Sequence, residues 1–436
     1  MIERNYYLQK LINSKNNGFP KVITGIRRCG KSYLLKTIYT NYLKKQLNVK
    51  ESDILVVELD DDKNILYRNP IELGKYVRDY CSGKKECYVF IDEIQLVTRI
   101  VNPAFTKGEI VVAKNGDDNV MTFVDVVLGL AREENIDLYV TGSNSKMLSS
   151  DIVTEFRDKA TNIHIGPLSF EEYYNYKKGS KNDALYEFLQ YGGMPLAVLK
   201  DSDDKKDYLK SLFKLTYFKD ILEHNKLNKS DALDALCAII SEGTGDLFNA
   251  IKIANTYKSK TKEKIDTETV TKYINYFVDA FIINEATRYD VKGRSEIGAL
   301  RKYYFVDNGL RNAWINFAYD DDGKLLENVV YNELLFNGYT VNVGTFESVE
   351  KDDNSKSIKK NYEIDFVAGK GLRKYYIQVC SDIAGIEAKE REIKPYIKLN
   401  DQIQKIIVIN KPIEETRDEN GFTIIGATDF LLRFIK

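Results

Sequence analysis

The chain has 436 residues, of which 43% are hydrophobic and 30% are charged, and its formal net charge at pH 7 is −1. This length exceeds what one hydrophobic core usually supports, so we expect several domains of a globular protein. No stretch reaches the roughly 18 consecutive apolar residues that span a bilayer, which excludes an integral membrane protein. Because the net charge is near zero, any surface for nucleic acid has to be a local patch.

The N-terminal residues and the cysteines both predict a cytoplasmic protein. Residues 1–8 carry an early acid and lack the apolar segment and cleavage site of a signal peptide. The cysteines are odd in number and include no close C-x-x-C pair, which argues against a disulfide framework and against a zinc site. They are Cys29, Cys81, Cys87, Cys237 and Cys380.

Between residues 22 and about 165, short apolar runs alternate with amphipathic segments. Such runs are typical of strands buried on both faces of a parallel sheet. The segments Lys31 to Leu43 and Phe123 to Arg132 are long enough for the crossover helices that parallel strands need. This part of the chain is therefore predicted to be α/β, with strands at residues 21–24, 54–59, 88–91 and 138–141.

A glycine-rich octet directly after the first of these strands has the P-loop pattern G-x-x-x-x-G-K-[ST]. Glycines let backbone N–H groups curl around phosphates, and the helix that follows adds partial positive charge at its N-terminus. We expect Lys31 to reach the β- and γ-phosphates of a nucleoside triphosphate and the Ser32 hydroxyl to bind Mg²⁺. The predicted nucleotide-binding residues are Gly25, Ile26, Arg27, Arg28, Cys29, Gly30, Lys31, Ser32 and Tyr33.

Two acids end the apolar run at residues 88–91. In this position, called Walker B, Asp92 is predicted to hold the Mg²⁺ shell. Glu93 is directed differently and is the candidate to orient or deprotonate the water that attacks the γ-phosphate. The alternative is that either acid caps a following helix. The presence of Glu93 favours hydrolysis over binding alone.

Two further residues are candidates for catalysis. Asn144 follows the strand that ends at Thr141, where its amide can contact the γ-phosphate or the water; alternatively, Ser143 and Asn144 cap the next helix. Arg157 lies shortly afterwards and can stabilise transition-state charge on a neighbouring subunit's nucleotide, or it can pair with a nearby acid. The sequence leaves both alternatives open.

After about residue 214 the alternating α/β pattern gives way to a run of helical patterns. Helical patterns near Ser230 to Glu242, Gly245 to Ala254 and Thr267 to Ile282 precede two aromatic-rich strands. Three helices followed by a hairpin predict a winged helix. A helix at Leu325 to Phe336 then precedes strands at residues 339–343, 362–368 and 374–380, which predicts a further α/β domain. The polar run at residues 351–356 is predicted to be an exposed, mobile loop.

Together with these motifs, five others resemble those of a large family of bacterial and archaeal AAA-type ATPases. They lie at residues 141–145, 167–173, 191–195, 288–293 and 302–312, so the resemblance covers nearly the whole chain. It implies ATP as the nucleotide and three domains: an AAA-type P-loop ATPase with a parallel sheet at 1–213, a winged helix at 214–310, and an α/β domain similar to PD-(D/E)XK nucleases and restriction endonucleases at 311–436. The family often has a second arginine where this chain has Lys159, which weakens the catalytic role of Arg157.

The C-terminal domain is expected to be catalytically degenerate. Nucleases of this class need an acid at the end of one strand, then an acid and a lysine on the next, around a metal. Asp365 fits the first acid, with Glu327 or Glu333 on the preceding helix as candidate helpers. On the next strand Gln378 and Cys380 stand where an acid and a lysine are required. We therefore expect no DNA cleavage.

Two kinds of partner fit the sequence. The hairpin Arg288–Lys302 contains five basic residues, and winged helices contact DNA phosphates with such hairpins, so duplex DNA is one candidate. However, the candidate recognition helix Thr267 to Ala280 offers Glu268 and Asp279, which do not suit base recognition. The other interpretation is that the charges on the hairpin are solvated and that a protein, or a second copy of this chain, is the partner.

The leading hypothesis is a Mg²⁺-dependent ATPase whose γ-phosphate state changes the arrangement of the winged-helix and nuclease-like domains. One alternative is a nucleotide-gated DNA-binding module. Another is a protein regulator that holds ATP without hydrolysing it.

Overall fold

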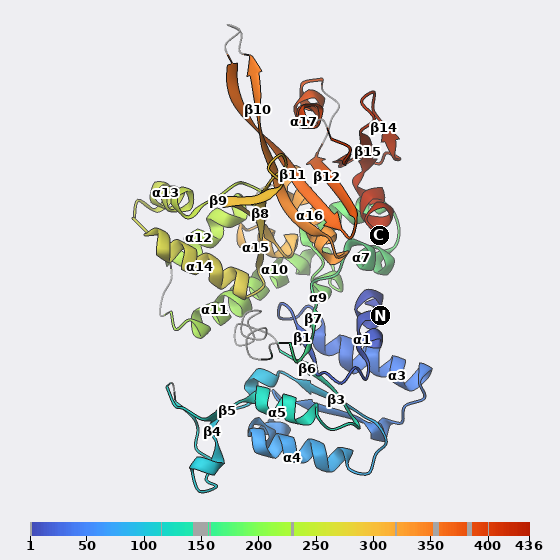
Figure 1. Cartoon of the computed structure of the whole chain (residues 1–436), viewed down its shortest axis with the longest axis vertical. Coiled ribbons are helices and arrows are strands. Elements are labelled where there is room, and N and C mark those ends of the chain that lie inside the picture. Colours follow the sequence, from blue (N-terminus) through green and yellow to red (C-terminus); the bar gives the residue numbers. More distant parts are fainter. Residues whose placement is uncertain are drawn as a thin grey trace. The chain divides into compact units, whose positions relative to one another are not determined.

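The computed structural model describes residues 2–114, 116–142, 156, 158–227, 231–318, 321–351, 357–381, 386–399 and 401–436. The chain forms two compact units, Met1–Gly166 and Pro167–Lys436 (Figure 1). The predicted division into three domains, with boundaries after residues 213 and 310, stays a prediction. None of the helices within the described ranges is long and apolar enough to cross a membrane.

A five-stranded sheet forms the centre of the first unit. Its strands are β1 (Lys21–Thr24), β2 (Ile54–Glu58), β3 (Cys87–Asp92), β6 (Ile136–Thr141) and β7 (Thr161–His164). The order is β2-β3-β6-β1-β7, and every neighbouring pair is parallel. The four predicted strands are therefore confirmed. Strand β7 was missed because polar residues dominate its sequence. A separate ribbon joins β4 (Ile100–Val101) to β5 (Val120–Met121).

Helices cover both faces of this sheet. They are α1 (Asn5–Ser14), α2 (Lys31–Tyr33), α3 (Thr40–Gln46), α4 (Pro70–Cys81) and α5 (Phe123–Leu130), and a π-helical turn at Leu34–Tyr39 joins α2 to α3. Successive side chains of a strand point to opposite faces. On β6, Leu138 and Val140 belong to the buried cluster formed with α4 and α5, which lie side by side (Figure 1). Tyr139 instead contacts Tyr39, with 2.6 Å between their hydroxyl oxygens.

The second unit contains an eight-stranded mixed sheet. Its strands are β8 (Ile283–Asp290), β9 (Ser295–Phe305), β10 (Thr340–Lys351), β11 (Ser357–Lys370), β12 (Arg373–Cys380), β13 (Gln404–Ile409), β14 (Thr416–Arg417) and β15 (Thr423–Gly426). The order is β14-β15-β13-β12-β11-β10-β8-β9. Because β8 pairs with β10 in parallel, the hairpin β8–β9 belongs to the same sheet as the C-terminal strands. Strands β10 and β11 continue as a two-stranded arm beyond the sheet (Figure 1).

Most helices of the second unit precede this sheet in the chain. These are α7 (Phe170–Lys177), α8 (Lys181–Tyr191), α9 (Pro195–Val198), α10 (Ser202–Leu212), α11 (Lys219–His224), α12 (Asp231–Glu242), α13 (Ala250–Thr261) and α14 (Thr267–Asp279). Four others in the described ranges lie between or after its strands: α15 (Asn308–Trp314), α16 (Asp322–Phe336), α17 (Ile386–Lys398) and α18 (Ala427–Asp429). The predicted bounds of α13, Gly245 to Ala254, are wrong. The helix starts later because Asn249 caps it, accepting a hydrogen bond from the Lys252 N–H at 2.7 Å.

Two of the motifs that carry the family resemblance meet inside this unit. The carboxylate of Asp307 accepts a hydrogen bond from the Gly193 N–H at 2.6 Å, and the Asn312 amide donates to the Gln190 carbonyl at 2.8 Å. A Cβ atom on Gly192 would lie 2.2 Å from the Asp307 carboxylate, so only glycine fits there. These motifs therefore hold α8 against α15 by buried hydrogen bonds.

Glu333 on α16 is buried and does not join the acids expected around Asp365. Its carboxyl group accepts a hydrogen bond from the Phe170 N–H at 2.6 Å, at the start of α7. Burial raises the pKa of Glu333 to about 8 although the Phe170 N–H opposes that shift. The folded chain thus binds this proton more tightly than the unfolded chain does, and the side chain is neutral at pH 7.

This pKa predicts how stability depends on pH. The contribution of Glu333 is fully present below about pH 4, the pKa of an unfolded glutamate, and is lost as the pH rises through about 8, by at most about 1.4 kcal/mol per pH unit. Glu333→Gln keeps the acceptor for Phe170 and cannot ionise. We expect the stabilities of variant and wild type to differ least near pH 4 and the variant to be more stable at pH 9, because the wild type loses this contribution progressively between about pH 4 and 8. The exposed Glu223→Gln is the matched control; equal pH dependence of all three proteins would contradict the assignment.

Candidate functional site

The loop after β1 has the backbone conformation that its glycines were expected to supply. Gly25 and Gly30 have φ values of +140° and +100°. A Cβ atom on Gly25 would lie 2.0 Å from the Ile165 carbonyl oxygen, so no other residue fits at that position. Within the loop, Ile26 and Cys29 are buried, whereas the side chains of Arg27 and Arg28 are exposed.

Lys31 lies at the start of the helix that follows the loop, and its side chain is buried. Its ammonium donates hydrogen bonds to the carbonyl oxygens of Gly25 and Ile26, at 2.9 and 3.1 Å. The loop thus folds around this cation, as expected for a lysine that binds phosphate. Tyr33, also predicted to bind the nucleotide, has an exposed side chain two residues further along the helix.

Asp92 lies at the carboxyl end of β3 and receives three donors from other parts of the chain. The Ser32 hydroxyl donates to its Oδ1 atom at 3.0 Å, and the Thr141 hydroxyl donates to the same atom. The Lys36 ammonium lies 3.0 Å from Oδ2 and also pairs with Glu58. The two predicted metal ligands, Ser32 and Asp92, are therefore in direct contact.

The charge on Asp92 follows from these contacts. Burial by itself would raise the pKa of the carboxyl group, but the hydrogen bonds from Thr141 and Ser32 and the nearby Lys36 ammonium outweigh burial, so the pKa is lowered. The carboxylate is ionised at neutral pH. An ionised carboxylate beside a hydroxyl oxygen is the hard-oxygen ligand set that Mg²⁺ prefers.

Glu93 follows Asp92 in the left-handed backbone region, with φ +57° and ψ +47°. This conformation is uncommon for a residue with a side chain and is often found at functional sites. The Glu93 N–H donates to the Thr141 hydroxyl at 3.2 Å, and the half-buried carboxylate accepts a hydrogen bond from the Gln95 amide. Thr141 thus positions both acids. The other two catalytic candidates, Asn144 and Arg157, lie outside the described residues, as does Ser143.

The N-terminal segment also contacts the loop, which sequence reasoning missed. The buried Arg4 guanidinium donates to the Cys29 carbonyl at 3.0 Å and to the Gly166 carbonyl at 2.9 Å. The Tyr7 hydroxyl accepts from the Gly166 N–H at 2.9 Å. No local pattern reveals these contacts, nor those of Lys36 and Thr141, because each joins residues far apart in the sequence.

A second set of charged residues surrounds Lys302 on β9. Its buried ammonium lies 2.9 Å from Glu327 on α16, 2.8 Å from Glu363 and 3.9 Å from Asp365, both on β11. Burial alone would lower the pKa of Lys302, but these carboxylates outweigh it and raise the pKa, so the cation persists. In the described part of the chain, no group of three or more His, Cys, Asp or Glu residues has the arrangement of a metal site.

Two residues of the neighbouring strand β12 lie close to Asp365. The Asp365 carboxylate accepts a hydrogen bond from the Val379 N–H at 2.8 Å, and the Gln378 side-chain oxygen lies 3.4 Å from the Asp365 nitrogen. Burial and the Glu327 charge raise the pKa of Asp365 well above its ordinary value. Glu327, Glu363 and Asp365 therefore all lie within 3.9 Å of the buried Lys302 ammonium.

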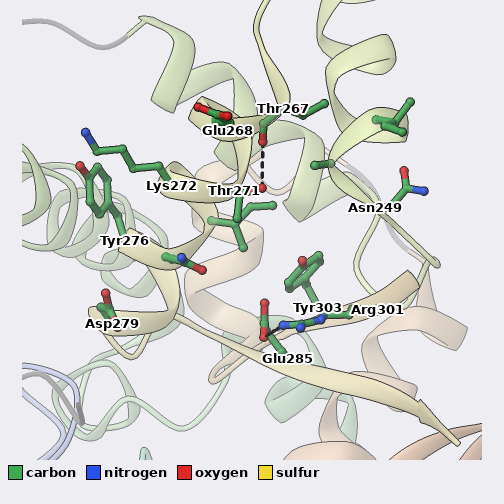
Figure 2. Close-up of a pocket in the computed structure, with 14 residues that line it drawn as sticks. Asn249, Thr267, Glu268, Thr271, Lys272, Tyr276, Asp279, Glu285, Arg301 and Tyr303 are labelled. Atoms are coloured by element: carbon green, nitrogen blue, oxygen red, sulfur yellow. Dashed lines mark hydrogen bonds and ion pairs between the residues drawn. The ribbon is translucent and has the colours of Figure 1, made fainter. Parts of the chain in front are cut away.

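A hollow of about 870 Å³ lies between α13, α14 and the hairpin β8–β9. Figure 2 shows polar and charged side chains from α14 along one side and an ion pair between Arg301 and Glu285 on the other. Its lining combines two cations with three acids: Lys272, Arg301, Glu268, Asp279 and Glu285. Since acids outnumber cations and one cation is paired, the hollow does not resemble a phosphate-binding surface.

Comparison with known proteins agrees with the first of these sites. A family described as an AAA domain matches residues 17–174, and a domain of unknown function (DUF8612) matches residues 182–321. An "Uncharacterized protein" of Haemophilus influenzae is 30% identical over 441 residues and covers 99% of both chains. "Uncharacterized protein MJ1544" of Methanocaldococcus jannaschii is 29% identical over 422 residues, covering 94% of this chain and 84% of its own.

Among solved structures, two from Aeropyrum pernix are similar to this chain at 10% identity. They are ORC1 in complex with DNA, with a TM-score of 0.30, and ORC2 in its ADP form, with a TM-score of 0.33. They cover 72% and 74% of this chain and 92% of their own chains. Similarity at this level carries no argument about function. The chain, an AAA-type domain followed by a domain of unknown function, belongs to the same family as the Haemophilus influenzae protein.

Proposed function

We propose that the chain is a Mg²⁺-dependent ATPase. The observation that carries this proposal is the contact of Ser32 with Asp92 beside the buried Lys31 at the carboxyl edge of a parallel sheet. Ligands of open α/β sheets bind at that edge. The match to an AAA domain over the same residues supports ATP as the nucleotide.

Each residue has a distinct role in this proposal. Lys31 exchanges its loop carbonyls for oxygens of the β- and γ-phosphates. Ser32 and Asp92 hold Mg²⁺, which when bound neutralises charge on the phosphates. Lys36 and Thr141 keep Asp92 ionised. Glu93 orients the attacking water and accepts its proton.

Removing the phosphate-binding cation tests the site most directly. Lys31→Ala should lower ATP hydrolysis to background and weaken ATP binding at least tenfold, because the other two cations of the loop, Arg27 and Arg28, have exposed side chains whereas the Lys31 ammonium is buried against the loop carbonyls. Steady-state phosphate release and binding of a fluorescent ATP analogue measure both effects. Lys44→Ala, at a partly exposed lysine on α3 that pairs with Glu51, is the matched control. Turnover retained by Lys31→Ala would overturn the site.

Glu93→Gln separates hydrolysis from binding. The amide still fills the space but cannot accept a proton, so we expect ATP binding within about twofold of wild type and turnover lower by at least 10²-fold. Single-turnover hydrolysis with Mg²⁺, with and without duplex DNA, makes the measurement, and the exposed Glu347→Gln is the control. Equal turnover of variant and wild type would contradict the role of Glu93, and no measurable turnover by either protein would assign the chain to non-hydrolysing regulators. Turnover raised by DNA would support the DNA-gated alternative.

We further propose that nucleotide state rearranges the second unit, in which a winged helix and a nuclease-like domain share one sheet and do not cleave DNA. Helices α12–α14 followed by the hairpin β8–β9 support the winged helix. For the nuclease-like domain, Asp365 on β11 beside Gln378 on β12 gives the expected strand positions. The absence of cleavage is supported by Lys302, whose ammonium lies among the acids where a metal would be needed.

The contacts of the hairpin favour a protein partner over DNA. Four of its five basic side chains bind groups of the second unit: Arg288 donates to Thr345, Lys292 to the Glu347 carbonyl, Arg301 pairs with Glu285, and Lys302 pairs with the acids described above. A side chain engaged in this way contributes less to phosphate binding. A protein, including a second copy of this chain, is therefore the favoured partner.

A substitution at Lys302 tests whether this ammonium is a structural counter-charge. Lys302→Met leaves the buried acids without a cation, so we expect a loss of about 3–5 kcal/mol in the free energy of unfolding. Urea unfolding measures the change, and Lys292→Met, at an exposed position on the same hairpin, is the matched control. Equal stability of the two variants, or DNA cleavage by wild type with Mg²⁺ or Mn²⁺, would contradict the assignment.

A further inference from the structure

Two cysteines that are six positions apart in the sequence lie in contact in the first unit. Cys81 is the last residue of α4, and Cys87 is the first residue of β3. Their Sγ atoms are 2.7 Å apart, and both side chains are buried. This separation is shorter than the van der Waals contact distance of two sulfur atoms and longer than the roughly 2.05 Å of a disulfide bond.

The other three cysteines have different surroundings. The Cys29 thiol donates to the Ile165 carbonyl at 3.3 Å, and the Cys380 thiol lies 3.9 Å from the Val408 carbonyl oxygen. Cys237 is buried on α12 of the second unit. Within the described residues, Cys81 and Cys87 thus form the one thiol pair in contact.

Asn135 holds the backbone on both sides of this pair. Its side-chain amide donates to the backbone carbonyls of Cys81 and Lys84, at 2.9 and 3.2 Å. Its backbone carbonyl accepts a hydrogen bond from the Cys87 N–H at 2.7 Å. The two Cα positions are therefore fixed before any bond forms. Ser82 and Gly83, directly after Cys81, are exposed, so opening of this one turn admits a small oxidant.

The two thiols also differ in acidity. The contact with the Cys87 thiol lowers the pKa of Cys81 against the effect of burial, and the nearby Lys84 ammonium acts in the same direction. The pKa of Cys87 is raised by the same pairing and by burial. Cys81 is thus the thiol that supplies the attacking thiolate.

We propose that Cys81 and Cys87 are an oxidative-modification site at which a small-molecule disulfide forms an intramolecular disulfide. The Cys81 thiolate attacks one sulfur of oxidised glutathione, forming a mixed disulfide and releasing one glutathione thiolate. Cys87 then loses its proton to solvent, attacks the Cys81 sulfur and releases the second glutathione. Two protein thiols are oxidised, and one disulfide of the oxidant is reduced to two thiols.

This site is separate from the proposed ATPase site. Strand β3 has six residues, so Cys87 at its start lies about 16 Å from Asp92 at its end. The inference therefore does not rest on the proposed function, and peptide mapping tests it independently of ATP hydrolysis.

Peptide mapping of the folded full-length chain tests the inference. The chain is incubated with oxidised glutathione, free thiols are alkylated, and trypsin digestion follows without reductant. Trypsin cleaves after Lys84 and Lys85, so peptides 79–84 and 86–99 stay together only if a disulfide joins them. We expect this cross-linked pair and three alkylated cysteines: Cys29, Cys237 and Cys380.

Three comparisons decide the result. Cys237→Ser should leave the cross-link intact, whereas Cys87→Ser should replace it with a glutathione adduct on Cys81. Five alkylated cysteines in the wild type would overturn the inference, and so would glutathione adducts without the cross-link. A cross-link that forms only in urea would do the same, because it would not depend on the folded geometry.

Discussion

The ionised carboxylate of Asp92 is the feature on which the candidate ATPase site depends. Burial at the end of β3 favours the neutral acid, which binds metal poorly. Hydrogen bonds from Ser32 and Thr141 and the charge of Lys36 reverse that preference. Ser32 and Lys36 follow β1, and Thr141 ends β6. These donors reach Asp92 because β3, β6 and β1 are consecutive parallel strands whose carboxyl ends lie at one edge of the sheet.

In the second unit the central buried charge is a cation, and acids surround it. There Glu327, Glu363 and Asp365 surround the ammonium of Lys302. Lys302 has three carboxylates within 3.9 Å, whereas Asp92 has one lysine, Lys36, at its Oδ2 atom and two hydroxyl groups at its Oδ1 atom. Both arrangements keep charge inside the protein, and only the Asp92 site is part of the proposed Mg²⁺ site. Burying an unbalanced charge would cost several kcal/mol in either unit.

The motifs that carry the family resemblance divide into two kinds. The P-loop and the acids after β3 bring polar atoms to one edge of a sheet, where chemistry can occur. The motifs around Gly192 and Asp307 instead join α8 to α15 through buried hydrogen bonds, and a Cβ atom at Gly192 would collide with Asp307. Their residue types are demanded by close packing, so these two motifs alone would not indicate a reaction.

The sequence by itself determined four of the five strands of the parallel sheet, the P-loop pattern and the position of the acids Asp92 and Glu93, because each depends on residues adjacent in the chain. Periodicity and glycine spacing express backbone geometry over a few residues, and that information is local. The late start of α13 also had a local cause, the Asn249 cap, but the helical pattern around it outweighed that signal.

Only the tertiary structure decided which distant groups complete each site. Lys36 and Thr141 reach Asp92, Lys302 reaches the acids of α16 and β11, and Cys81 meets Cys87 across a turn. A lysine or threonine has the same sequence signature whether it is solvated or buried against a carboxylate. The sheet order and the helix packing make that choice, since they bring together segments that no local pattern connects.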